Sequence, residues 1–489
     1  MKNKLLIMLF AFTLLSVSGC KDFFDVNEPS NTVAEGDQEI EIILPAVEYN
    51  VGTLQFSAAY STGQLQQHIA SYFEHGVDQH YETSMAGVWG KFYSRILYPL
   101  NKMDKLADEG NMKHYKGMIN VLRALSLGMT TDLYGNMPYS DAGQGSANMQ
   151  PSVETQQALY DRIQLLLDDG ITNLSAQDNS GFGHIPGDIF YHGDIAKWIR
   201  LAYTLKARYA LHLTKVNGTQ AAQDAITYLQ NGFVSNSDDL QMTFTEKNKN
   251  PWHSSVVLSS RTGNISVLFS EQLVNYMNAT IYPTATIDPR LPDYVDNHGA
   301  ASYDGAVNGA EGLDANGNSA NTVFNENSFY FQETSPLVLV SFAEANFLKA
   351  EAEFIVNGGN TTSIGSTQEA YDAYLGGITA NMDKIGIDTT LRDAYINDPV
   401  IAVTPASLKL EHIMKEKYIA LLLNPEIFTD LRRYDFSTDI YKGLDIPVGR
   451  NPDIPAGLWP RRAIYVTSEV DRNPNISQVN FWDKVWWDQ

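Results

Sequence analysis

The sequence predicts a nearly all-α chain of paired antiparallel helices that carries one loop-rich lobe. Two observations support this prediction. Apolar residues recur at helical spacing through most of the chain, as expected for amphipathic helices. Between residues 231 and about 327 this period gives way to glycine, asparagine, serine and aspartate with scattered apolar residues. A loop-rich insert of this length in a compact protein is usually either functional or disordered.

Helical periodicity places helices on both sides of this insert. We expect them, in chain order, at residues 39–60, 63–73, 89–107, 114–132, 152–169, 193–213, 219–230, 335–358, 367–385 and 404–434. Capping signals support several ends: Gly135 follows one helix, and Ser335 and Thr404 each precede a proline at the start of another. Paired helices of this kind suggest a solenoid of the tetratricopeptide type, although the chain has no clean repeat of about 34 residues.

The stretch 404–434 is the member around which we expect the other helices to pack. It comprises two short helices that meet at Asn424-Pro425, and Ile413, Leu421 and Phe428 face inward from them. It contains no obvious catalytic group, so we interpret it as scaffold.

The N-terminus has the features of a bacterial lipoprotein signal. Lys2 and Lys4 precede an apolar run, 5–15, that is too short to span a membrane, and Val-Ser-Gly-Cys at 17–20 matches a lipoprotein cleavage box. Cys20 is the only cysteine of the chain, so it has no disulfide partner and is the expected lipidation site. We therefore expect a signal peptide at 1–19, a lipidated tether at 20–38 and one helical domain at 39–489 with its insert at about 231–327.

The charge balance excludes two classes of partner. The chain has 57 acidic against 34 basic residues, a formal net charge of −23. This excess argues against binding to nucleic acid and against electrostatic attachment to anionic lipid headgroups, so we expect membrane association only through the lipid anchor. Aromatic residues make up 11% of the chain and include 26 tyrosines, whose flat apolar face and polar tip suit protein interfaces or stacking on sugars.

The sequence offers no convincing metal or cofactor site. His68, His75 and His80 are spaced too widely across a loop for a typical zinc site, and no cysteines assist them. The run 314–325 begins like a calcium loop but has serine and asparagine where glycine and glutamate are required. Because serine elbows, HExxH motifs and dinucleotide fingerprints are also absent from the sequence, we expect neither a metal nor a cofactor.

Charged residues in the helices are interpreted as structural. Arg432 and Arg433, with Glu344, Glu351 and Glu353, are expected to form ion pairs that lock helix pairs together, because strong pairing perturbs charges without catalysis.

Further polar and aromatic positions are also assigned to the scaffold. Asp132 is expected to stabilise the turn that ends its helix, and Trp89 is expected in the core. Trp486 and Trp487 are expected to pin the C-terminal tail.

Aromatic and planar polar side chains gather in two predicted loops, one before the Trp89 helix and one in the insert. Recognition of a sugar needs aromatic faces for the apolar side of the ring and planar polar groups for its hydroxyls. The candidate ligand-binding residues are Tyr72, His75, Asp78, His80, Tyr81, Trp252, Tyr282 and Tyr303. The alternative interpretation is that these side chains only pack the loops.

Four segments carry a resemblance to a known family. They are TDLYGNMPY at 131–139, FAEANFLKAEA at 342–352, KEKYIAL at 415–421 with Arg432-Arg433, and PRRAIY at 460–465 with Glu469 and Asn473-Pro474; YHGD at 191–194 and DPRL at 288–291 match as well. In this order, behind a lipoprotein signal, they resemble the SusD/RagB family of outer-membrane lipoproteins from Gram-negative bacteria, and most closely its SusD-like two branch.

The resemblance implies a body of tetratricopeptide-like helix pairs and a ligand face built from loops in the same two regions. It also implies a non-enzymatic role, in which a surface-exposed lipoprotein of the outer membrane captures an oligosaccharide and delivers it to a partner TonB-dependent (SusC-like) transporter. A peptide ligand is the alternative within the family. An all-helical glycoside hydrolase is the alternative enzyme and would need two carboxylates roughly 5–9.5 Å apart. A helical-repeat adaptor that binds no small molecule is a third class.

Overall fold

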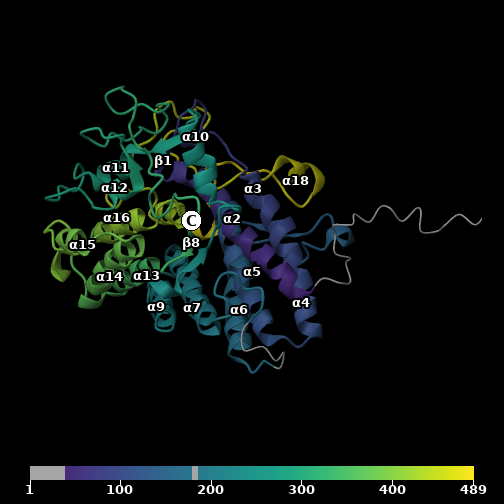
Figure 1. The fold of residues 1–489 in the computed structure, drawn as a ribbon. Helices are drawn as coiled ribbons and strands as arrows, with labels where there is room; N and C mark the ends of the chain where they lie inside the picture. Colours follow the sequence, from purple (N-terminus) through teal and green to yellow (C-terminus); the bar gives the residue numbers. More distant parts are fainter. Residues whose placement is uncertain (1–38, 179–184) are drawn as a thin grey trace, which may run out of the picture.

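The structure is built mainly of packed helix pairs, which confirms the predicted fold class. The computed structural model describes residues 39–178 and 185–489. Its longer helices are α2 (Ile40–Leu65), α4 (Tyr98–Glu109), α5 (Lys113–Tyr134), α6 (Gln156–Ser175), α7 (Ile195–His212), α9 (Thr219–Leu229), α13 (Phe342–Val356), α14 (Gln368–Ile385) and α16 (Leu410–Ala420). In Figure 1 a row is formed by α4, α5, α6, α7, α9, α13, α14 and α15 (Thr389–Ile396), and α5 packs on α6, α7 on α9, and α13 on α14.

Short elements joined by loops make up the segment 231–327, which lies above the helix row in Figure 1. It contains α10 (Leu258–Arg261), α11 (Glu271–Met277) and α12 (Leu291–Tyr294). The described strands pair two by two: β1 (Ile69–Ser71) with β5 (Val267–Phe269), β2 (Met137–Pro138) with β3 (Val153–Glu154), β4 (Leu240–Met242) with β8 (Leu337–Val340), and β6 (Val295–Asp296) with β7 (Val323–Phe324). Because β1 and β8 lie outside this segment, their pairs fasten it to the helical body.

Strand pairing accounts for two errors in the predicted helices. The helix expected at 63–73 is wrong: α2 continues to Leu65, and Ile69–Ser71 then forms the strand β1. The helix expected from Ser335 also begins too early, because β8 precedes it, and the actual cap is Ser341, whose Oγ accepts a hydrogen bond from the Glu344 N–H at 3.0 Å. In both places the partner strand lies far away in sequence, so local periodicity could not reveal it.

Two other helices have irregular starts. Thr404 begins only a 3₁₀ turn at Pro405–Ser407, and α16 starts later, at Leu410. The predicted helix through Trp89 is present but consists of α3 (Ala86–Gly90), a π-helical segment (Lys91–Leu97) and α4. Trp89 is buried, as expected.

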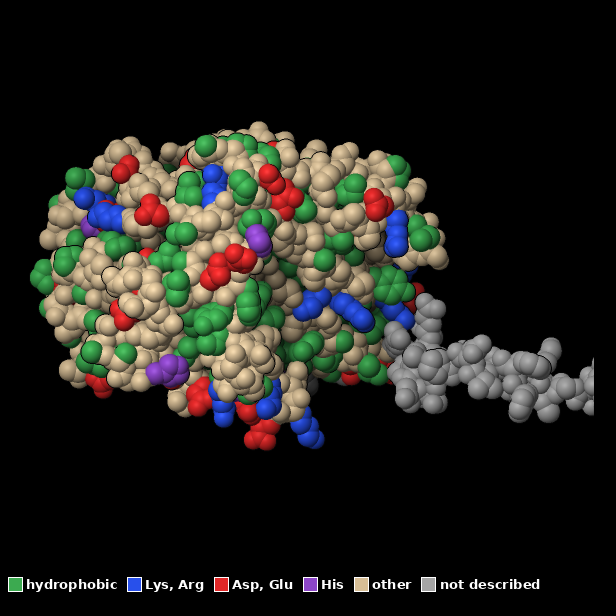
Figure 2. All heavy atoms as spheres, turned by 90° about the horizontal axis from the view of Figure 1, so that it is seen from above, with side chains coloured by type: hydrophobic (Ala, Val, Ile, Leu, Met, Phe, Trp, Pro, Cys, Tyr) green, Lys and Arg blue, Asp and Glu red, His purple; other side chains and the backbone are tan. Residues whose placement is uncertain are grey.

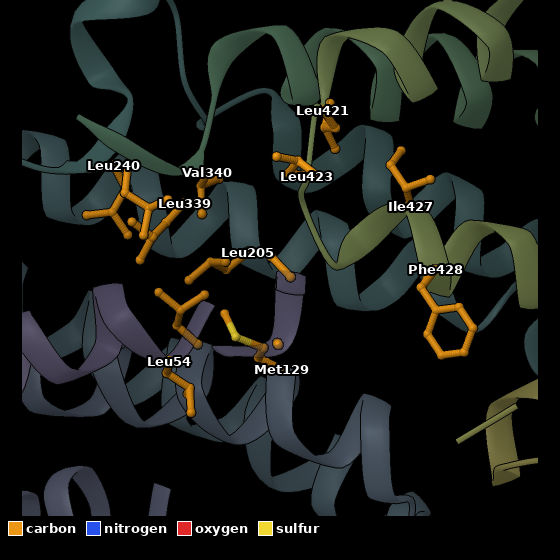
Figure 3. Packing of buried hydrophobic residues seen from close by; sticks show 14 of the residues in the cluster. Leu54, Met129, Leu205, Leu240, Leu339, Val340, Leu421, Leu423, Ile427 and Phe428 are labelled. Atoms are coloured by element: carbon orange, nitrogen blue, oxygen red, sulfur yellow. The ribbon is translucent and has the colours of Figure 1, made fainter. Parts of the chain in front are cut away.

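The core lies where α2, the paired helices and the stretch 404–434 meet. The side chains that converge there, shown in Figure 3, come from α2 (Leu54), α5 (Met129), α7 (Leu205), β4 (Leu240), β8 (Leu339, Val340) and the 421–428 corner (Leu421, Leu423, Ile427, Phe428). Helices α5 and α7 approach closely because Gly128 lacks a side chain: a Cβ at this position would lie 2.2 Å from the Tyr209 ring. The helix α17 (Glu426–Arg433) is buried along its whole length.

Buried ion pairs connect these helices, as predicted for two of the named glutamates. The Arg208 guanidinium donates to both carboxylate oxygens of Glu344 at 2.6 Å, and Arg433 pairs with Glu351. Burial opposes ionisation of Glu351, but the positive charges of Arg433 and Lys417 outweigh it and lower the pKa of Glu351 to about 2. These pairs hold α7 on α13 and α13 on α17.

Arg432 and Asp132 have roles that differ from the expected ones. Arg432 donates to the backbone carbonyl of Asp132 at 2.6 Å and lies over the indole ring of Trp487 at 4.6 Å. The carboxylate of Asp132 accepts hydrogen bonds from Tyr160 and from the Trp487 indole N–H, the latter at 2.9 Å. Asp132 therefore holds the C-terminal tail on α5 and α6, and the prediction that it stabilises its own turn is wrong.

Candidate functional site

A cleft of about 730 Å³ opens on the loop-rich face. Its lining comes from α11 with its N-cap Ser270, the loop after α11, the 307–308 loop, the 443–448 tail segment and the residue Gln67 just beyond α2. The full set is Gln67, Ser270, Glu271, Gln272, Asn275, Ile281, Val307, Asn308, Gly443, Asp445, Ile446, Pro447 and Val448. Figure 2 views the molecule from above and shows small groups of hydrophobic side chains among polar ones. The volume lies within the range of small-molecule sites, which is roughly 300–1,000 Å³.

Hydrogen bonds between distant segments fix the walls of this cleft. The β1–β5 pairing brings Ser270 beside the end of α2, where the Ser270 N–H donates to the His68 carbonyl at 3.0 Å. The Asn308 amide donates to the Ile69 carbonyl at 3.0 Å. The Gln67 amide donates to the Asp445 carbonyl at 2.7 Å, which holds the tail segment in place. The walls are therefore set by hydrogen bonds between residues far apart in the sequence and not by one local loop.

Gly309 allows the tail segment to reach the cleft. Its φ is +83°, and a Cβ there would lie 1.9 Å from the Val448 carbonyl oxygen. The Val448 N–H donates to the Asn308 carbonyl at 3.0 Å in the same contact. Any larger residue at 309 would push the 443–448 segment away from the 307–308 loop.

The chemistry of the lining suits a hydroxyl-rich ligand without negative charge. The half-buried amide of Asn275 can donate and accept hydrogen bonds, whereas the buried Gln272 amide already donates to the Lys442 carbonyl at 2.9 Å. Ile446 and Val448 expose apolar surface, 44% and 57% respectively. Among the described residues that line the cleft the only charged ones are Glu271 and Asp445. Because both side chains are carboxylates, they repel a negatively charged ligand in this cleft.

The predicted ligand residues Tyr72, His75 and Tyr81 lie at least partly at the surface near this cleft. Tyr72 is 36% exposed and its ring covers Gly312, which belongs to the same 307–313 loop that forms one cleft wall. His75 is exposed and packs edge-on against the partly buried Tyr81, with ring centroids 4.7 Å apart. Phe73, next to Tyr72, is 60% exposed.

Asp78 and His80, two of the candidate ligand-binding residues in the loop before the Trp89 helix, are buried. The Asp78 carboxylate accepts hydrogen bonds from the N–H groups of Ser71 at 2.9 Å and Gly309 at 2.8 Å, and burial raises its pKa above the usual value. His80 packs on Trp459, and burial lowers its pKa to about 3. Both side chains brace the loops against each other.

Trp252 and Tyr282 are also buried, whereas Tyr303 is partly buried. Trp252 is only 3% exposed and packs edge-on against Phe56 at 4.9 Å. Tyr282 is 6% exposed and packs against Tyr276 at 5.4 Å. The expected exposure is wrong at these two positions because a segment of short elements has little other apolar surface from which to build its own core.

Sequence reasoning missed most of the residues that line the cleft. Asn275 lies in a helix too short to recognise from periodicity, and Ile281 lies in the loop after that helix. Ile446 and Val448 lie in the segment after α17, which has no helical period. The one available signal was the run Asp-Ile-Pro-Val-Gly at 445–449, which places exposed apolar residues in a turn-rich stretch.

Comparisons with known proteins agree with this architecture. A family model described as "Starch-binding associating with outer membrane" matches residues 31–442. The chain belongs to the SusD-like family. Its members associate with the outer membrane according to that description.

Solved structures support the same fold for this SusD-like protein. A protein described as chitin-binding superimposes with a TM-score of 0.72 at 23% identity, covering 91% of this chain and 100% of its own. A chitin-binding SusD homologue from Flavobacterium johnsoniae gives 0.72 at 20% identity, covering 92% and 99%. A SusD/RagB family protein from Bacteroides thetaiotaomicron gives 0.70 at 21% identity, covering 91% and 99%. No curated protein matches the chain significantly.

A buried cluster of two carboxylates and one histidine in this SusD-like protein resembles a metal site, but the histidine itself can balance the negative charge of the carboxylates. Asp132, His212 and Glu426 place one ligand atom each within 4.8 Å of one another. The two imidazole nitrogens of His212 face different carboxylates, Nε2 towards Glu426 at 2.9 Å and Nδ1 towards Asp132 at 3.5 Å, so one ion could not use both. Burial alone would lower the His212 pKa, but Glu426 and Asp132 outweigh it and raise the pKa to about 9. The protonated imidazole thus supplies the positive charge.

The membrane association of the SusD-like protein is not explained by its described helices. None of those in 39–178 and 185–489 is long and apolar enough to cross a membrane. Cys20, the signal peptide at 1–19 and the tether at 20–38 lie outside the described residues.

Proposed function

We propose that this SusD-like protein captures a neutral oligosaccharide in the loop-face cleft and delivers it, uncleaved, to a TonB-dependent transporter. Lipidation at Cys20 would hold it at the outer-membrane surface. The observation that carries the proposal is the cleft itself, which combines amide groups, apolar surface and no basic side chain among its described lining residues. Fragments of starch or chitin have the matching chemistry, and those glycans are named for the family and for two structurally similar proteins.

Tyr72, His75, Tyr81 and Tyr303 are proposed as rim contacts for a longer chain of sugars. The Tyr72 ring packs on Gly312, and the same loop contributes Val307 and Asn308 to the cleft wall. The exposed part of the ring could therefore stack on a sugar that extends out of the cleft. Asp78, His80, Trp252 and Tyr282 are assigned instead to the support of the site because their side chains are buried.

A peptide is the second candidate ligand, because the carboxylates of Glu271 and Asp445 could bind its amine or a basic side chain. The same residues define the hydrolase alternative. Asp445 is exposed and Glu271 is half-buried, whereas a general acid is normally held in a water-poor pocket. Binding without cleavage is therefore favoured over catalysis.

Titration calorimetry on the lipid-free protein, residues 21–489, tests the proposal. Maltoheptaose, chitohexaose and a basic hexapeptide of similar length are compared. At least one of the two glycans is expected to bind, and Asn275→Ala is expected to weaken that binding about fivefold, because one net hydrogen bond is worth about 1 kcal/mol. Asn397→Ala, an exposed asparagine beyond α15, is the matched control and should have no effect.

Three outcomes would overturn the proposal. Binding of the peptide alone would assign the cleft to peptides. Release of new reducing ends from the bound glycan, abolished by Glu271→Gln, would make the protein a hydrolase. The absence of binding to any of the three ligands would favour an adaptor. Delivery is tested separately, by uptake of the labelled glycan into cells with and without the Cys20→Ala variant.

A further inference from the structure

A second cleft, of about 800 Å³, lies in the helical body and is independent of the proposed function of the loop face. It is lined by α4, by Arg123 of α5 and by the segment that leads into the 143–147 turn: Tyr98, Asn101, Lys102, Asp104, Lys105, Leu106, Glu109, Arg123, Ser140, Gly143, Gln144 and Ala147. In Figure 1, α4 stands at one end of the helix row, away from α11 and α12 of the lobe. The two clefts therefore belong to different parts of the surface.

The walls of this second cleft are fixed by hydrogen bonds. The Asn101 amide donates to the carbonyls of Ala142 and Gly143 at 3.4 and 3.3 Å, which joins α4 to the opposite wall. The Ser140 N–H donates to Glu154 at 2.5 Å, which ties that wall to β3. Arg123 donates to the side-chain oxygen Oδ1 of Asn101 at 2.9 Å and so orients the Asn101 amide. The cleft is thus shaped before any ligand arrives.

Tyr98 gives the cleft an aromatic face. Its side chain is 45% exposed, although most large apolar side chains of α4 are buried. A Cβ added at Gly145, whose φ is +59°, would lie 3.8 Å from the Tyr98 ring, so the turn packs beside the ring at van der Waals distance. Gln144 lines the same cleft. An open ring beside planar amides is the combination that sugar recognition uses.

The charge of this lining is opposite to that of the loop-face cleft. Three basic side chains, Lys102, Lys105 and Arg123, line it together with two acidic ones, Asp104 and Glu109. Asp104 and Arg123 pair with each other at 3.2 Å, and Lys116 contacts Asp104 at 2.8 Å, so Lys102 and Lys105 remain against Glu109 in the charge balance of the lining. In a chain of net charge −23 such a local excess of basic groups stands out and favours an anion.

We propose that this second cleft binds an acidic oligosaccharide, in which a sugar ring stacks on Tyr98 and a carboxylate or sulfate group contacts Lys105. Guanidinium and ammonium groups form charge-assisted hydrogen bonds to such oxyanions. The site would give the protein a second ligand class, which the loop-face cleft rejects through Glu271 and Asp445.

Titration of the lipid-free protein with tetragalacturonate, with a sulfated tetrasaccharide and with maltotetraose tests this inference. We expect at least one of the anionic ligands to bind, with an affinity that falls as salt rises from about 50 to 500 mM because screening shortens the Debye length. Tyr98→Ala is expected to weaken this binding about fivefold, which corresponds to about 1 kcal/mol, the middle of the range for an aromatic contact. Lys105→Glu should weaken it further. Whichever anionic ligand binds more tightly identifies the preferred acidic group.

Matched variants keep the test independent of folding and of the loop face. Tyr371→Ala on α14 and Lys349→Glu on α13 are the controls and should leave the anionic affinity unchanged, as should Asn275→Ala in the other cleft. Melting temperatures within about 2 °C of wild type show that the variants fold. The inference is overturned if neither anionic ligand binds at about 10 mM, a concentration that would detect even millimolar affinity. It is equally overturned if Tyr98→Ala and Lys105→Glu bind as well as their controls.

Discussion

The two adjacent tryptophans at the C-terminus should contribute very differently to stability. Trp487 is fully buried, donates its indole N–H to Asp132 at 2.9 Å and packs under the guanidinium of Arg432 at 4.6 Å. Trp486 is only partly buried and lies 6.0 Å from the Tyr160 ring. Trp487→Ala removes a large buried side chain and should therefore cost about 3–5 kcal/mol. Trp486→Ala should cost about 1 kcal/mol, because the ring is already partly in water.

Scanning calorimetry converts these values into melting temperatures. A chain of 489 residues with an unfolding entropy of about 2.1 cal/mol/K per residue loses about 1 °C for each kcal/mol. Trp487→Ala should thus lower Tm by about 3–5 °C, and Trp486→Ala by about 1 °C. Trp487→Phe keeps the ring over Arg432 but loses the hydrogen bond to Asp132, so we expect a drop of about 1–2 °C. Equal losses for the two alanine variants would refute this account of how the tail is held.

Other buried and exposed residues give three further predictions. Glu351→Gln leaves Arg433 with a weaker buried partner and should cost about 3–5 kcal/mol in urea unfolding. The folded-state pKa of His212, about 9, lies above the ordinary histidine value of 6.5 because Glu426 and Asp132 outweigh the effect of burial. The contribution of His212 to stability should therefore be full below pH 6.5 and lost as pH rises through about 9, and His212→Gln should abolish this pH dependence. Trp252→Ala should lower Tm by about 3–5 °C through its lost packing, whereas Tyr72→Ala should keep Tm and weaken glycan binding about fivefold.

A specific result would refute each of these predictions. If the Glu351→Gln variant is as stable as wild type, water must reach the Glu351–Arg433 pair in the folded protein. If the stability of the wild-type protein is constant from about pH 6.5 to 9, the His212 imidazole is not held in its protonated form by the fold. If Trp252→Ala lost affinity but kept its melting temperature, the ring would be a ligand contact after all.

Local sequence signals predicted the helical body but not the surface of the site. Asp194, for example, caps α7 with its side chain, and Gly135 ends α5 with a φ of +70°. These features depend on a few neighbouring residues and are therefore readable from the sequence. The all-α class and the family followed from such segments.

The cleft depends instead on contacts between residues far apart in the chain. Ile69 pairs with Phe269, and Val448 reaches Asn308, and neither contact leaves a periodic pattern. Aromatic composition was also ambiguous, because Trp252 and Tyr72 come from equally loop-like stretches and only the first is buried. Whether a loop aromatic packs inward depends on how much apolar surface the surrounding segments supply, which the sequence does not state.

A crystal structure of the lipid-free protein with the glycan that binds it most tightly will show whether the loop-face cleft is the glycan site. We predict an intact sugar chain in this cleft, between α11 and the 443–448 segment, with one ring against Ile446 or Val448 and hydrogen bonds to Asn275. A neutral glycan seated elsewhere on the molecule, or a cleaved product beside Glu271, would contradict it.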